Sequence, residues 1–159
     1  MKKFLLYLIM AYLALTVQAI FFKGIKPDFV LVLVCFYSLR HGELRGIAYG
    51  ALTGLLIDTA GGVILGPHIV SKSLAAFLIW AVREKMFQWN IFINTVLIAF
   101  LSIVDIFVVY ICLEVFSGVS LDNMPLKIFV MQVIYTVVAS IAAYKFLKPG
   151  KVRDMLFQD

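Results

Sequence analysis

The stretch GELRGIAYGALTGLLIDTAGGVILG, residues 42–66, carries a glycine or an aspartate at every fourth position. We call these positions the ridge: Gly42, Gly46, Gly50, Gly54, Asp58, Gly62 and Gly66. Most of the residues between them are apolar. In lipid, helices associate through close backbone approach over small residues and through polar contacts, because apolar side chains gain little by meeting each other. The stretch therefore predicts a membrane helix that packs closely against other helices.

The composition of the whole chain supports a membrane protein. Of its 159 residues, 64% are hydrophobic and 14% are charged, and the mean hydropathy is +1.04. A soluble domain is about 45–50% apolar and about 25% charged, and a small soluble fold cannot hide this much apolar surface. The fold class expected is all-α: a polytopic membrane helical bundle that forms a single transmembrane domain.

The apolar segments suggest about six membrane spans. A spanning helix needs about 20 predominantly apolar residues. Residues 46–82 would reach about 55 Å as one helix, too long for one crossing of about 30 Å, so the glycines and proline at 61–67 must break it. The predicted spans are residues 4–22, 28–41, 43–61, 67–82, 90–113 and 126–147, followed by a short tail at 148–159.

The basic residues predict the orientation of these spans. Lys and Arg residues are enriched on the cytoplasmic side of membrane proteins. With six spans, the side that holds both termini receives ten of the 14 basic residues, and the four others are Lys23, Lys26, Lys72 and Lys127. Both termini are therefore expected in the cytoplasm. The net charge of +5 needs no nucleic acid as a partner, because a basic rim beside anionic membrane lipid is usual.

Asp58 is the acid set into the ridge. An ionisable group inside a membrane segment is a functional-site hypothesis by default. Asp58 lies 13 residues beyond Arg45, about 20 Å along a helix, which places it in the outer half of the membrane, and Lys72 falls at a similar depth. Three interpretations stay open: an Asp58–Lys72 ion pair that fixes helix packing, an acid that binds a partner or gates a substrate, and proton translocation.

Two other features also allow a structural and a functional interpretation. Pro27 and Asp28 suit the start of a helix, since proline fits the first turn and an acid meets the positive end of the helix dipole; recognition is the alternative. The ridge advances 40° per step on a helix of 3.6 residues per turn, so it winds around the helix. It can serve packing within the bundle or contact with another protein. Asp105, in the fifth span, has no evident partner in the sequence.

Catalytic motifs do not stand out in the sequence. His41 and His68 fall on opposite expected membrane faces, and no HExxH, GxSxG or phosphate-loop pattern occurs. We therefore expect no enzyme, no catalytic residues, no cofactor and no metal site.

The 27–66 stretch, PDFVLVLVCFYSLRHGELRGIAYGALTGLLIDTAGGVILG, resembles the MreD family of bacterial rod-shape-determining membrane proteins. The chain length and the expected number of spans are also similar, while the family often has Ser-Gly where this chain has Gly61-Gly62. The features that carry the resemblance are Pro27-Asp28, the basic turn with Arg40 and Arg45, Gly46, Gly50, the Gly54–Asp58 block and Leu65-Gly66.

The resemblance implies a non-enzymatic scaffold in the cytoplasmic membrane. Its implied partners are an MreC-like protein, the actin-like MreB filament, and a RodA-type glycosyltransferase with its transpeptidase, which together make lateral peptidoglycan during cell elongation. It also implies a fold similar to the six-helix substrate-binding subunits of energy-coupling-factor vitamin transporters. That likeness supplies one alternative function, a subunit that binds a small molecule within the bundle. Asp58 and Asp105 suggest another alternative, a subunit that handles ions or protons.

Overall fold

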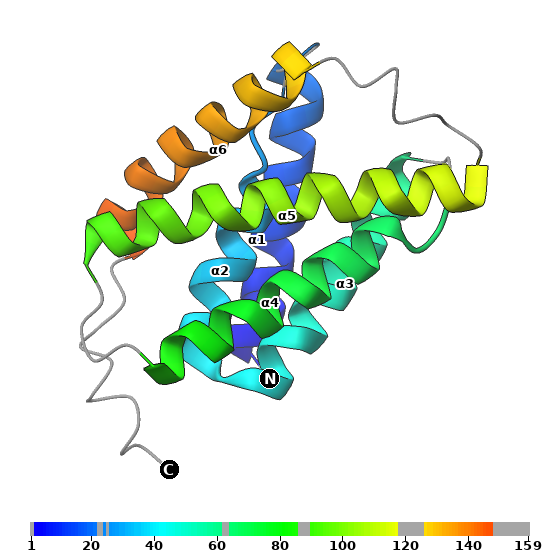
Figure 1. Cartoon of the computed structure of the whole chain (residues 1–159). Coiled ribbons are helices and arrows are strands. Elements are labelled where there is room, and N and C mark those ends of the chain that lie inside the picture. Colours follow the sequence, from blue (N-terminus) through cyan, green and yellow to red (C-terminus); the bar gives the residue numbers. More distant parts are fainter. Residues whose placement is uncertain are drawn as a thin grey trace.

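The computed structural model describes residues 2–21, 24, 26–61, 64–85, 90–117 and 126–147. These residues form helices without strands, which confirms the predicted all-α bundle (Figure 1). The predicted tail at 148–159 lies outside the described residues. The helices are α1 (Lys2–Phe21), α2 (Phe29–His41), α3 (Glu43–Gly61), α4 (Pro67–Lys85), α5 (Ile91–Ser117) and α6 (Leu126–Leu147).

Successive helices run between two opposite faces of the bundle (Figure 1). The start of α1, the α2–α3 junction and the ends of α4 and α6 lie toward the lower left of the view. The end of α1, the α3–α4 turn and the end of α5 lie toward the upper right. This alternation is what a chain of successive membrane spans requires.

Three helices are long and apolar enough to cross a membrane by length and composition: α1, α5 and α6. Helix α2 has only 13 residues, about 20 Å at 1.5 Å per residue. Helices α3 and α4 have 19 residues each, but charged residues such as Arg45 and Lys72 lower their hydropathy. The six crossings stay a prediction for these three segments.

Helix α2 is the centre of the bundle. Its residues 30–39 are all buried, as expected of a helix that is hydrophobic on every side. One side of α2 packs with α1 and α3 through residues such as Tyr37 and Tyr49. The other side packs with α4 and α5 through residues such as Leu31 and Ile98. Because both packed layers share α2, it holds the two halves of the bundle together.

Polar contacts fix α1 against this centre. The hydroxyl of Tyr49 donates a hydrogen bond to the carbonyl of Tyr7 at 2.8 Å, and the Arg40 guanidinium donates to the Tyr7 hydroxyl at 3.1 Å. Near the other end of α1, the Gln18 amide donates to the carbonyl of Pro27. These contacts hold α1 at both ends of the short helix α2.

Candidate functional site

The ridge glycines of α3 lie where the helix meets its neighbours. A Cβ atom placed on Gly46 would stand 2.7 Å from the Ser38 hydroxyl of α2. One on Gly50 would stand 2.9 Å from the Lys72 carbonyl carbon of α4, and one on Gly54 would stand 2.6 Å from the His68 carbonyl carbon. The contact surface therefore passes from α2 to α4 along α3, as the winding of the ridge predicts, and these three glycines serve packing within the bundle.

Gly66 has a different role from the helix-packing one expected for it. Among the described residues, no atom comes within 4 Å of a Cβ placed on it, so it makes no close contact with the described helices. Its φ of 132° is one that side chains with a Cβ rarely adopt. Gly66 is therefore a turn glycine that lets the chain reverse between α3 and α4.

Asp58 caps the start of α4. Its carboxylate accepts hydrogen bonds from the backbone N–H groups of Gly66 (2.9 Å), His68 (3.2 Å) and Ile69 (3.3 Å), and lies 2.7 Å from Nδ1 of the His68 ring. Pro67, the first helical residue, has no N–H to offer. A buried acid at the positive end of a helix satisfies donors that otherwise lack partners. Asp58 thus ties α3 to the first turn of α4.

The structure corrects the expected ion pair between Asp58 and Lys72. The Lys72 ammonium group contacts Asp28 at 2.5 Å and Asp105 at 2.7 Å, while Asp58 pairs with His68. The two side chains belong to separate polar groups because the first turn of α4 already saturates the Asp58 carboxylate. Counting residues placed Asp58 and Lys72 at a similar depth in the membrane. It could not tell in which direction each side chain points.

Asp28, Lys72 and Asp105 form what we call the Lys72 cluster. Lys72 is completely buried, and Asp28 and Asp105 are 9% and 4% exposed. Lys72 donates to both carboxylate oxygens of Asp105, at 2.7 and 2.8 Å, as well as to Asp28. One cation between two acids holds α2, α4 and α5 together in the interior, where unpaired charges are costly.

Further donors complete the Lys72 cluster. The Ser71 hydroxyl donates to Asp105 at 2.6 Å, and the backbone N–H of Leu31 donates to Asp28 at 2.8 Å. The second bond makes Asp28 the N-cap of α2, whereas Pro27 lies one residue before this cap and outside the helix, not in its first turn as expected. The backbone N–H of Asp28 donates to the Thr136 hydroxyl at 2.9 Å, which adds α6. Four helices therefore meet at one sealed polar centre.

Asn94 and Ser140 form a second polar link that sequence reasoning missed. The Asn94 side-chain amide donates to the Ser140 hydroxyl at 2.8 Å, and both residues are completely buried. This contact joins α5 to α6. A buried amide in an apolar helix was the available signal, because such a group needs a partner. Within the described part of the chain, no three His, Cys, Asp or Glu residues form a group that could hold a metal ion.

One protein family matches this chain. The family model described as rod shape-determining protein MreD matches residues 2–148, nearly the whole chain. No curated protein and no solved structure matches the chain significantly.

Proposed function

The chain belongs to the MreD family of rod shape-determining membrane proteins, and from this premise we propose that it is a non-enzymatic scaffold of the cell-elongation machinery. The family match over residues 2–148 is the observation that carries the proposal. In this role the protein binds an MreC-like membrane-anchored protein in the cytoplasmic membrane. Through it, the scaffold helps to organise RodA-type glycosyltransferase, transpeptidase and MreB, and so lateral peptidoglycan synthesis.

The distribution of polar contacts supports a scaffold. Three glycines of the ridge (Gly46, Gly50 and Gly54), the Asp58 cap and the Lys72 cluster hold helices of this chain to one another. The apolar surface left over belongs largely to α1, α5 and α6, where Tyr12, Phe100 and Val138 are among the exposed side chains. Partner contacts are therefore expected on these outer helices, within the membrane plane.

The alternative of a vitamin-type binding subunit finds less support. A small-molecule site combines apolar walls with a few convergent polar groups that orient the ligand. The cavity between α1, α2 and α6 is lined by apolar side chains such as Leu13, Val32 and Ala143. Polar orienting groups are missing from that lining.

A complementation experiment tests the scaffold. A rod-shaped bacterium depleted of its own MreD becomes the host, and expression of this chain is expected to restore rods and to co-purify an MreC-like protein in mild detergent. The proposal would be contradicted if the protein is inserted in the membrane but the cells stay round and no MreC-like protein co-purifies.

Crosslinking then locates the partner surface. A photo-reactive amino acid is placed at Tyr12, Phe100 or Val138, with Val70 on α4 as an exposed control. We expect crosslinks to the MreC-like protein from one of the outer helices and none from Val70. A reporter fusion at Asp159 tests the orientation in the same cells: periplasmic phosphatase activity there would refute cytoplasmic termini.

A further inference from the structure

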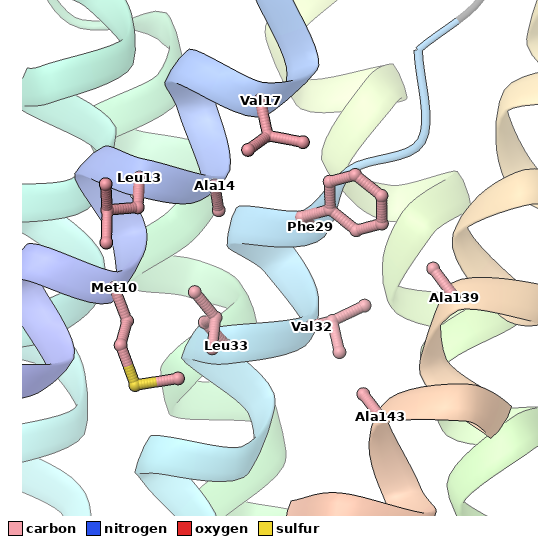
Figure 2. Close-up of a pocket in the computed structure, with 9 residues that line it drawn as sticks. All are labelled: Met10, Leu13, Ala14, Val17, Phe29, Val32, Leu33, Ala139 and Ala143. Atoms are coloured by element: carbon pink, nitrogen blue, oxygen red, sulfur yellow. The ribbon is translucent and has the colours of Figure 1, made fainter. Parts of the chain in front are cut away.

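The bundle has a groove between α1, α2 and α6, with a volume of about 370 Å³. Figure 2 shows α1 on one side, α6 on the other and α2 between them. Three of the lining residues are alanines, which leave the room that larger side chains would fill. The lining residues are Met10, Leu13, Ala14, Val17, Phe29, Val32, Leu33, Ala139 and Ala143.

The size of the groove indicates which kind of molecule can occupy it. It runs from Val17 to Met10 along α1, seven residues or about 10 Å. A volume of 370 Å³ over that length gives a cross-section near 35 Å², roughly 7 Å across. A helix with side chains is about 10–12 Å wide, so it would rest on the rim of this groove instead of filling it. The volume equals about a dozen groups of about 30 Å³, the size of a water molecule and of a methylene, which matches much of one acyl chain.

The charge at one end of the groove selects the headgroup. Met10 and Ala143 mark the end nearer the face where α1 begins and α6 ends (Figures 1 and 2). The basic residues of these three helices, Lys2, Lys3, Arg40, Lys127 and Lys145, lie toward that face with the exception of Lys127. None of the three helices contains an Asp or a Glu.

The distances suit a lipid whose chain lies in the groove. Arg40 is seven residues beyond Leu33 on α2, about 10 Å and on the same side of that helix, and Lys3 is seven residues before Met10 on α1, again about 10 Å. A headgroup phosphate at the membrane surface would therefore meet cations while its chain remains between the helices. Clusters of basic residues at a membrane face attract anionic lipids.

From these observations we infer that the groove binds an anionic phospholipid of the leaflet on that face. One acyl chain lies between α1 and α6 on the floor formed by α2, and the phosphate lies at the basic end. The site goes beyond the scaffold function and does not depend on it, since it needs only the membrane and this chain.

Native mass spectrometry of the purified full chain in mild detergent tests the site, with phosphatidylglycerol and phosphatidylcholine of the same chains as probes. Ala143→Phe fills the groove, and Ala142→Phe on the exposed neighbouring position of α6 is the matched control. We expect one tightly bound phosphatidylglycerol in the wild type and in Ala142→Phe. Ala143→Phe should bind it about tenfold more weakly, because two displaced methylenes suffice for that factor.

The headgroup is tested with Lys2→Gln combined with Lys3→Gln. We expect the wild type to prefer phosphatidylglycerol over phosphatidylcholine by about tenfold and the double variant to lose most of that preference. If Ala143→Phe does not fold, Ala14→Leu replaces it, with Ala19→Leu as its exposed control.

Three results would overturn the inference. The first is equal phosphatidylglycerol binding by the groove-filling variant and its control. The second is equal affinity of the wild type for both lipids. The third is displacement of the phospholipid by a polyprenyl phosphate or by a co-purified membrane helix that crosslinks to Ala139. Restoration of rods by the variants is scored separately, so the lipid site and the scaffold function can fail independently.

Discussion

Gly54→Ala is the most direct test of how the bundle is packed. The added Cβ would stand 2.6 Å from both the His68 carbonyl carbon and Ile69 Cα, whereas ordinary contacts begin at 3.4 Å. Helix α4 would therefore have to move by at least about 0.8 Å, since the His68 carbonyl oxygen stands closer still. A shift of that size stretches the bonds that Asp58 accepts from Gly66 and His68, now 2.9 and 3.2 Å, beyond hydrogen-bond range.

The expected loss of stability follows from these terms. Overpacking costs about 1–3 kcal/mol, and weakened hydrogen bonds to a charged group cost about 1.5–3 kcal/mol. Replacing a helical glycine by alanine returns about 0.5–1 kcal/mol. We expect a net destabilisation of about 2–4 kcal/mol. The measurement is the free energy of unfolding in mixed micelles, with increasing SDS as the denaturant.

Two further glycines calibrate the result. Gly61→Ala, at the end of the same helix, meets no atom within 4 Å and should leave stability unchanged or slightly higher. Gly46→Ala should cost less than Gly54→Ala, because the closest atom is the Ser38 hydroxyl, which can rotate, and the Ser38 Cα at 3.2 Å needs only a small shift. A Gly54→Ala protein as stable as Gly61→Ala would refute the close packing of α3 on α4.

Two charged positions give the remaining predictions. Lys72→Met leaves the carboxylates of Asp28 and Asp105 without their cation, so it should cost about 3–5 kcal/mol, and Asp105→Asn should recover part of this loss in the same unfolding assay. A double variant no more stable than Lys72→Met would contradict the cluster. Asp58→Ala removes the cap of α4 and should lower the free energy of unfolding by about 1–2 kcal/mol or more. Adding Lys72→Met should lower it further. If Lys72→Met instead raised the stability of Asp58→Ala, the ion pair between Asp58 and Lys72 would be supported after all.

The ridge shows how much of this fold the sequence could predict. A glycine at every fourth position indicated both a membrane helix and its close contacts, because only small residues allow backbones to approach. The winding of the ridge left open whether one end faces out of the bundle, and the structure packs Gly46, Gly50 and Gly54 all inside it. Which helix stands opposite each glycine is set by tertiary packing, and the spacing of residues within one helix does not carry that information.

The charged residues show where the prediction failed. Counting residues gives the depth of Asp58 and Lys72 in the membrane, but two more acids, Asp28 and Asp105, compete for the same lysine. Pro67 gave a signal that sequence reasoning did not use. A proline marks a helix start, and the backbone N–H groups of the first helical turn need an acceptor from outside the helix. Asp58, nine residues before this proline and ten before His68, supplies it.

The Lys72 cluster also constrains how the protein is made. Its contacts join residues that are far apart in the chain. Lys72 contacts Asp105, which comes 33 residues later, and the backbone N–H of Asp28 contacts Thr136, which comes 108 residues later. A chain that emerges from the ribosome must therefore enter the membrane with a lysine and an acid still incompletely matched. Contacts this distant in sequence form slowly because the loop between them must close first. The insertion machinery would therefore have to keep α2 and α4 away from lipid until α5 and α6 are made. Chains whose synthesis stops before α5 should be degraded by membrane quality control.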